Sequence, residues 1–255
     1  LHALFGLYDY RFYEMEEAAV ASFLQARAFD GLNVTIPYKK TVIPYLDALT
    51  DTAVRLGSVN TIVKQKDGTL LGHNTDFGGF LYMVKKSGFS LSGKKVLVLG
   101  NGGAAASVCA VLEDLKANFT IISRRGENTY DTLSAHRDTE YIVNTTPLGM
   151  YPQNGGSPVS LAEFPGLLGV MDIVYNPFKT ALLLEAEKLS IPYISGLSML
   201  VAQGKESAEW FLGSPVPDSE TERVLKILSA KKRNLVLLGM PGAGKTTLGK
   251  LLAMY

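Results

Sequence analysis

The sequence predicts an α/β protein in which a small N-terminal α/β unit precedes a doubly wound parallel sheet. The first reason is that short β-rich runs, such as residues 32–36 and 60–63, alternate with stretches of helical period, such as residues 16–27. The second is that an apolar run at 96–99 begins the order strand, glycine-rich turn, helix and strand, which is typical of parallel β-α-β units. We therefore expect two domains followed by a short C-terminal segment.

Composition favours an ordinary globular protein with small-molecule partners. Of 255 residues, 47% are hydrophobic and 19% are charged, which is enough apolar material for a sizeable core. The 25 basic and 24 acidic residues leave a net charge of +1, so nothing indicates binding to nucleic acid or to an anionic membrane. A single cysteine, Cys109, and apolar runs far shorter than the roughly 20 residues of a membrane span favour a reducing cytoplasm. We expect a cytoplasmic monomer or homodimer, and the lack of an initial Met suggests a missing beginning.

The first unit, residues 1–88, is expected to form one domain around a small sheet. Asp67-Gly68 lies between two apolar runs and predicts a hairpin turn with positive φ at the glycine. The hairpin leads to the polar sequence 73–76, His-Asn-Thr-Asp.

The second unit, residues 89–198, follows a polar break and is expected to hold the parallel sheet. Beyond the first strand, further strands are predicted at 141–143, 170–174 and 192–194. Helical patterns at 199–211 and 219–228 predict a region, residues 199–230, that returns to the first domain. Residues 231–255 begin with a basic run and another buried-strand pattern, and are treated as a separate segment.

A glycine-rich turn between the strand at 96–99 and a helix predicts a dinucleotide site. Gly100 permits the tight turn, Gly102 lets the backbone approach a pyrophosphate, and Ala105 allows close packing of the helix. Because strand, motif and helix follow in the required order, we predict a Rossmann domain. Its phosphate loop contains Gly100, Asn101, Gly102, Gly103 and Ala104. The alternative is a turn that needs glycine for steric reasons alone.

The end of the next strand indicates which dinucleotide binds. The sequence there is Ser123-Arg124-Arg125, about twenty residues after the glycines, where enzymes that use NAD usually carry Asp or Glu. Guanidinium groups can hold a 2′-phosphate through bidentate hydrogen bonds, whereas a carboxylate would repel it. We therefore predict NADP(H) as the cofactor. Alternatively, these arginines are only solvated surface residues.

Six ordered motifs lie between about residues 3 and 230. They are 33–39 (NVTIPYK), 57–61 (GSVNT), 72–79 (GHNTDFGG), 144–150 (NTTPLGM), 172–177 (DIVYNP) and 196–203 (GLSMLVAQ). Together these motifs resemble the shikimate dehydrogenase family. The resemblance implies an oxidoreductase of aromatic amino acid biosynthesis that reversibly reduces 3-dehydroshikimate to shikimate with NADPH.

The resemblance also assigns roles to individual residues. The family's catalytic lysine and aspartate fall on Lys39 and Asp76. Positions that bind substrate fall on Thr35, Asn60, Tyr175 and Gln203, and positions beside the ribose or nicotinamide fall on Asn144, Thr145, Gly196 and Met199. No metal ligand is implied.

The chemistry of carbonyl reduction explains the need for these residue types. An alkoxide that forms at the substrate's C3 oxygen needs nearby positive charge and a proton donor, and Lys39 can supply both. Asp76 would orient the ammonium and exchange a hydrogen bond with the adjacent substrate hydroxyl. Taken alone, Lys39 would more often be a solvated residue, Asp76 a helix cap and Asn60 a turn residue. We expect His73 to be exposed and leave it outside the site.

Two departures from the family leave other functions open. The buried first strand and the Ser-x-Ser-Pro element, which grips the substrate carboxylate, have no counterpart, and residues 2–5 resemble the helix that follows them. Loss of an inner strand would leave backbone groups unpaired. The alternatives are a quinate/shikimate dehydrogenase with relaxed cofactor use and an inactive nucleotide-binding fragment.

The C-terminal segment carries a second nucleotide motif. Residues 239–246 (GMPGAGKT) follow an apolar run and fit the P-loop pattern G-x-x-x-x-G-K-[ST], with glycines at Gly239 and Gly244. In such a loop the backbone would cradle the phosphates of ATP, Lys245 would neutralise their charge and Thr246 would ligate Mg²⁺. The continuation resembles shikimate kinase, so we expect a bifunctional parent protein. About twenty residues cannot form a kinase core, and we expect no kinase activity from them.

Overall fold

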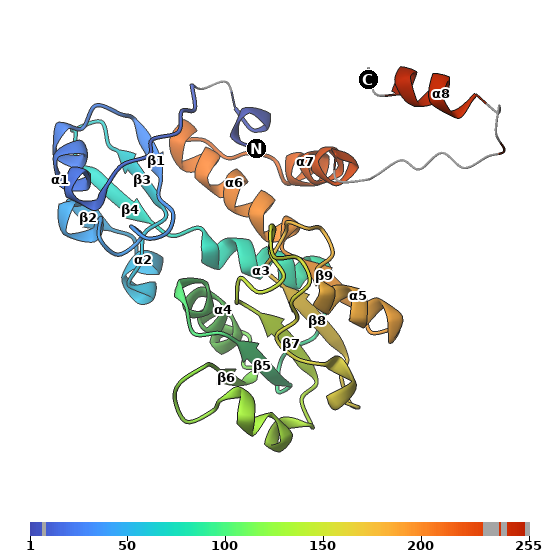
Figure 1. Ribbon diagram of the computed structural model, residues 1–255. Coiled ribbons are helices and arrows are strands. Elements are labelled where there is room, and N and C mark those ends of the chain that lie inside the picture. The colour runs from blue at the N-terminus through green and yellow to red at the C-terminus, as the bar shows by residue number, and fades with distance from the viewer. Residues whose placement is uncertain (7–8, 232–239, 241–243, 253–255) are drawn as a thin grey trace.

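The computed structural model contains two β-sheets joined by long helices (Figure 1). Residues 1–6, 9–231, 240 and 244–252 are described. The first sheet has four strands in the order β1-β3-β4-β2, and the second has five in the order β6-β5-β7-β8-β9. Within these described ranges, no helix is long and apolar enough to cross a membrane. The α/β fold class predicted from the sequence is therefore confirmed, with a doubly wound parallel sheet as its second sheet.

The N-terminal sheet is small and mixed. Its strands are β1 (Gly31–Asn33), β2 (Ala48–Leu49), β3 (Thr61–Lys64) and β4 (Leu70–His73). β1 and β4 both run antiparallel to β3, and β2 runs parallel to β4. Gly68, between β3 and β4, has a φ of 85°, which confirms the predicted hairpin. Helices α1 (Glu17–Ala26) and α2 (Asp51–Leu56) supply apolar side chains to the same core as β3 and β4.

The strand predicted at 32–36 is wrong in its extent, because β1 ends at Asn33. Proline has no N–H to donate to a sheet ladder, and the chain turns instead: the N–H of Tyr38 donates to the carbonyl of Thr35 at 2.9 Å. The next residue, Lys39, is held beside the start of β3, since its carbonyl accepts the N–H of Val59 at 2.8 Å. These two hydrogen bonds fix the position of the Lys39 backbone, from which its side chain extends.

All five strands of the second sheet are parallel. They are β5 (Lys95–Leu99), β6 (Asn118–Ile122), β7 (Tyr141–Asn144), β8 (Gly169–Asp172) and β9 (Tyr193–Ser195). Val96 and Val98 belong to the core cluster that includes α4 (Gly103–Asp114), whereas Leu97 and Leu99 belong to the cluster that includes α5 (Ala181–Lys188). A strand buried on both faces is apolar at every position, which explains the continuous run at 96–99.

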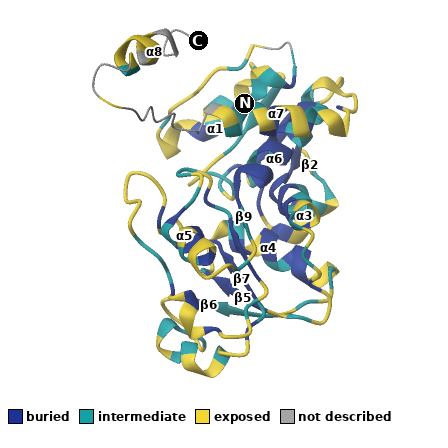
Figure 2. Cartoon of the chain, turned by 90° about the vertical axis from the view of Figure 1, so that its right-hand side faces the viewer, coloured by how far each residue is buried: buried dark blue, intermediate teal, exposed yellow. Residues whose placement is uncertain are grey.

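Two helices connect the sheets. The chain passes from the first sheet to the second through α3 (Asp76–Ser87) and leaves the second through α6 (Leu197–Leu212), which lies beside α3 (Figure 1). α6 is largely buried (Figure 2), and the helix predicted at 199–211 is confirmed with two further residues at its start and one at its end. The remaining helices are η1 (His2–Leu4), η2 (Ile43–Tyr45), η3 (Tyr130–His136), η4 (Leu161–Glu163), α7 (Asp218–Lys231) and α8 (Lys245–Leu252).

Candidate active site

A lysine and a carboxylate from different elements meet at the edge of the N-terminal sheet. The Nζ atom of Lys39 lies 2.6 Å from Oδ2 of Asp76. The Asp76 side chain is only 7% exposed and that of Lys39 is 24% exposed. Lys39 lies in the turn after β1, where its carbonyl accepts the N–H of Val59, and Asp76 is the first residue of α3. Both backbones are therefore held by hydrogen bonds. The ammonium is thus partly open to solvent while the carboxylate is enclosed.

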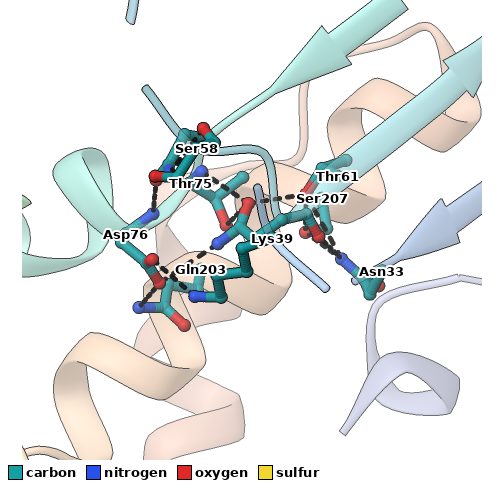
Figure 3. Close-up of polar contacts among 10 residues, drawn as sticks. Asn33, Lys39, Ser58, Thr61, Thr75, Asp76, Gln203 and Ser207 are labelled. Carbon is teal, nitrogen blue, oxygen red and sulfur yellow. Dashed lines mark hydrogen bonds and ion pairs between the residues drawn. The ribbon is translucent and has the colours of Figure 1, made fainter. Parts of the chain in front are cut away.

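Two amides occupy the other oxygen of this carboxylate (Figure 3). Oδ1 of Asp76 accepts hydrogen bonds from Nε2 of Gln203 at 2.9 Å and from Nδ2 of Asn60 at 3.1 Å. The N-cap of α3 is Thr75, and the carboxylate bonds to these side chains instead of capping the helix. Position at a helix N-terminus and three donors both stabilise a negative charge on Asp76.

Asn60 is engaged on both ends of its amide. Its Oδ1 accepts the backbone N–H of Thr75 at 2.9 Å and the hydroxyls of Thr75 at 3.2 Å and Thr61 at 3.1 Å. The side chain therefore connects the end of β4 to β3 as well as to Asp76.

Two predicted substrate-binding residues lie outside this hydrogen-bonded group. Thr35 is exposed and lines a groove of about 1000 Å³ between β1 and residues 9–15. Tyr175 is 40% exposed in the loop after β8. The structure therefore brings together Lys39, Asp76, Asn60 and Gln203, but not these two.

The glycine-rich turn lies where the strand order of the second sheet reverses. β5 pairs with β6 on one side and with β7 on the other, and ligands of doubly wound sheets bind in the crevice at such a point. Gly100 has a φ of 103°, and a Cβ there would lie 2.9 Å from Oγ1 of Thr145. A Cβ at Gly102 or Gly103 would meet no atom within 4 Å, so the space before the N-terminus of α4 is open. Asn101 is exposed and Ala104 half-buried in the same turn, which suits an incoming pyrophosphate.

The residues after β6 form an exposed turn. Ser123 is buried and its hydroxyl donates to the carbonyl of Arg125. Arg124 and Arg125 are both exposed. This placement leaves two guanidinium groups available to a phosphate beyond the strand end.

The ends of β7 and β8 hold a buried polar group. Asn144 donates to Oδ1 of Asp172 at 3.0 Å, and the hydroxyl of Thr145 donates to the carbonyl of Leu99 at 2.7 Å. At the start of α6, a Cβ on Gly196 would lie 1.9 Å from the carbonyl oxygen of Ile173, so only glycine fits. Met199 follows one turn later on α6 and is buried.

Asp172, a residue without a predicted role, is fully buried at the end of β8. Burial raises the pKa of this carboxyl to about 6, opposed by hydrogen bonds from Thr180, the N–H of Val174 and Asn144. The sequence signal for a buried polar role is an acidic residue inside the apolar run 170–174, because a buried carboxyl needs hydrogen-bond partners.

The expectation that His73 is exposed is wrong, because only 7% of this residue is accessible. Its Nδ1 lies 2.8 Å from the hydroxyl of Thr50, and its Nε2 lies 2.7 Å from Oε1 of Glu206 on α6. Both partners are distant in sequence, and no local pattern pointed to them.

The P-loop prediction falls largely outside the described residues. Gly239 and residues 241–243 are not described. Gly244 has a φ of 74°, and Lys245 begins α8 with its Nζ donating to the carbonyl of Met240 at 2.7 Å. Thr246, the predicted magnesium ligand, lies in the first turn of α8 and is exposed.

A parallel sheet with a glycine-rich turn, placed beside a smaller sheet, defines a two-domain α/β protein of the dinucleotide-binding class. The family model "Shikimate dehydrogenase substrate binding domain" matches residues 6–62. Shikimate dehydrogenase (NADP(+)) from Shouchella clausii is 35% identical over 246 residues, covering 89% of this chain and 88% of that protein. The chain therefore belongs to the shikimate dehydrogenase family.

Solved structures agree with this assignment. A chorismate mutase/shikimate 5-dehydrogenase fusion protein from Clostridium acetobutylicum has a TM-score of 0.83 at 30% identity, covering 87% of this chain and 86% of that one. Shikimate 5-dehydrogenase from Thermus thermophilus, solved in complex with NADP(H) and shikimate, has a TM-score of 0.71 at 31% identity and covers 83% of both chains.

Proposed function

We propose that this protein is an NADP-dependent shikimate dehydrogenase that reversibly reduces 3-dehydroshikimate to shikimate. The observation that carries the proposal is the contact between Lys39 and Asp76 at 2.6 Å, in a chain that belongs to this family. Relatives named as NADP(+)-dependent shikimate dehydrogenases cover most of the chain at about 35% identity.

Reduction of the ketone adds a hydride to carbon and a proton to oxygen. When bound, NADPH supplies the hydride. Lys39 stabilises the negative charge that develops on the carbonyl oxygen and donates the proton to it. Asp76 holds the ammonium in place and accepts a hydrogen bond from the neighbouring substrate hydroxyl. Gln203 and Asn60 orient the carboxylate and, with Thr35 and Tyr175, contact the substrate.

The residues of the second sheet fit NADP(H). Open space before α4 at Gly102 and Gly103 accommodates a pyrophosphate, and the exposed Arg124 and Arg125 can bind the 2′-phosphate. Asn144, Thr145, Gly196 and Met199 form the region assigned to the ribose and nicotinamide. In this proposal, residues 1–88 and 199–230 bind substrate and residues 89–198 bind the cofactor.

The test follows NADPH absorbance with 3-dehydroshikimate for the wild type, Lys39→Met and Asp76→Asn. Loss of a positioned proton donor or its partner should lower kcat by about 10²–10⁴-fold, with the KM for NADPH little changed. Lys40→Met is the matched control, because this neighbouring lysine is exposed and contacts neither Asp76 nor Gln203 in the described structure. Full turnover by Lys39→Met would rule out the mechanism.

The rival assignment is a quinate/shikimate dehydrogenase that tolerates NAD. The exposed Arg124 and Arg125 favour NADP instead. Oxidation of shikimate and quinate, each with NADP⁺ and NAD⁺, separates the two. We expect shikimate with NADP⁺ to give the highest kcat/KM, and Arg124→Ala to reduce the preference for NADP⁺. A preference for quinate would support the rival, and lack of turnover with every pair would support an inactive nucleotide-binding protein.

We also propose that residues 239–246 form a phosphate-binding loop of the shikimate kinase type. The support is the P-loop pattern, with Lys245 at the start of α8. Binding of Mg²⁺-ATP is measured by calorimetry with NADPH present in excess, so that the dinucleotide site is filled. Weak binding that Lys245→Ala abolishes would support this function, and equal binding by the variant would contradict it.

A further inference from the structure

Helix α6 presents a stripe of four side chains to the N-terminal sheet. The stripe consists of Gln203, Glu206, Ser207 and Trp210, at the spacing i, i+3, i+4 and i+7 of a single helix face. Gln203 bonds to Asp76, and Ser207 bonds to Asn33 at 2.8 Å and to Thr61 at 3.1 Å (Figure 3). Three side chains of this face, Gln203, Glu206 and Ser207, are therefore hydrogen-bonded to other elements, and Trp210 packs on His73.

Glu206 and His73 form the second contact of this stripe. The Thr50 hydroxyl accepts the N–H of Ala53 at 3.3 Å and lies 2.8 Å from Nδ1 of His73. The carboxylate of Glu206 can only accept, so Nε2–H of the ring donates to it at 2.7 Å. Both ring nitrogens are thus occupied by Thr50 and Glu206, which argues against a proton shuttle at His73.

Two glycines of α3 make room for the stripe. A Cβ at Gly79 would lie 2.5 Å from Cγ of Gln203, and a Cβ at Gly78 would lie 2.2 Å from Oε2 of Glu206. Each glycine therefore faces one polar side chain of α6. A side chain at either position would force its partner on α6 to move.

We propose that His73 and Glu206 are positioning residues that fix helix α6 against α3, so that Gln203 stays on Asp76. Because His73 lies three residues before Asp76, and Glu206 lies three residues after Gln203, the two contacts join the same pair of segments. Breaking the outer contact lets α6 shift and withdraws Gln203 from the carboxylate. The consequence for activity rests on the proposed function.

The kinetic test compares Glu206→Ala with Glu206→Gln. The alanine variant should raise the KM for 3-dehydroshikimate about tenfold, the size expected for losing a hydrogen bond to a charged group, with kcat within about threefold and the KM for NADPH unchanged. Glutamine keeps an oxygen that accepts Nε2–H, so it should restore the KM to within about threefold of wild type.

A matched control is Glu222→Ala. Glu222 also ties a C-terminal helix to α3, through Lys86 at 2.7 Å and Tyr82 at 2.6 Å, but it is remote from Asp76. It should leave both KM values unchanged. A merely structural role of Glu206 would lower the active fraction, and hence the apparent kcat, without moving the KM for 3-dehydroshikimate; that result would overturn the proposal.

A second measurement does not depend on turnover. Trp210 is the only tryptophan of the chain, and its ring lies 4.7 Å from that of His73, so its fluorescence reports this contact. Glu206→Ala and Gly78→Ala should both shift the emission to longer wavelength as the indole gains contact with water, whereas Glu222→Ala should not. If the wild type were inactive on 3-dehydroshikimate, the proposed function would be wrong. The fluorescence shift would then still test whether the contact between His73 and Glu206 positions α6. An unchanged spectrum in both variants would refute it.

Discussion

Asp172→Asn should stabilise the protein at neutral pH and have little effect near pH 4. Asp172 is fully buried, and the groups that bond to it are all neutral donors: Asn144, Thr180 and the N–H of Val174. Burial therefore raises the pKa of the carboxyl from 3.8 to about 6. A neutral amide of the same shape avoids the cost of burying a charge, and its NH₂ can donate to Thr180.

The magnitude follows from this rise in pKa. Raising a carboxyl pKa from 3.8 to about 6 penalises the charged folded form by about 3 kcal/mol. Because the folded pKa is higher than the unfolded one, the favourable contribution of Asp172 is complete below about pH 3.8 and is lost as the pH rises through about 6. Allowing about 1 kcal/mol for rearranged hydrogen bonds, the gain at pH 7.5 is about 2 kcal/mol, or about 4–8 °C in Tm for a chain of this size.

The assay is thermal unfolding of both proteins from pH 4 to pH 7.5, monitored by calorimetry. The difference in Tm between variant and wild type should grow with pH and level off above about 6.5. Asp138→Asn is the control, since Asp138 is exposed and its hydrogen bond with Lys95 lowers the pKa of its carboxyl. Its stabilising effect is lost as pH falls, so this variant should be slightly less stable than wild type at neutral pH. A Tm difference for Asp172→Asn that is the same at every pH would refute the reasoning.

Three further changes test packing and surface contacts. Gly196→Ala should destabilise by at least about 2 kcal/mol in urea unfolding, because the new Cβ would overlap the carbonyl of Ile173; an unchanged midpoint would contradict the geometry. Burial raises the pKa of Cys109 to about 11, so the native protein should react slowly with a disulfide reagent at pH 7.5 and rapidly in urea; immediate labelling of the native form would be inconsistent with burial. Arg55→Ala removes the bonds from α2 to Asp114 on α4 and should leave the urea midpoint nearly unchanged, since solvent screens an exposed ion pair; a clearly lower midpoint would contradict this expectation.

The second sheet could be predicted well from the sequence because its signals are local. The apolar run at 96–99, the tight turn at Gly100 and the helix after it follow from neighbouring residues. The end of β1 was predicted less well. Its β-branched residues continue to Ile36, but Pro37 and the hydrogen bond from Tyr38 to Thr35 turn the chain earlier.

Candidate site residues could be predicted where they lie in recognisable motifs. They could not be predicted where contacts with residues distant in the sequence determine whether a side chain is buried. Lys39 and Asp76 were found through their motifs, and the structure places them in contact. The burial of His73 depends on Glu206, 133 residues later, and on the ring of Trp210. No spacing within one segment carries that information, so a polar loop was the natural expectation.

Asp76 and Asp172 show that the charge of the hydrogen-bond partners, more than burial, determines whether a buried carboxyl can stay ionised without cost to stability. Asp76 and Asp172 are both enclosed, and each accepts three side-chain or backbone donors. Only Asp76 has a cation among its three donors. This cation is the Lys39 ammonium, which compensates the negative charge and is itself partly exposed to solvent. The donors to Asp172 are all neutral, so a negative charge on this buried carboxyl lowers the stability of the folded protein. Asp76→Asn should therefore lower kcat by about 10²–10⁴-fold, whereas Asp172→Asn should keep the wild-type kcat and gain stability. Equal loss of activity in both variants would show that Asp172 takes part in the reaction.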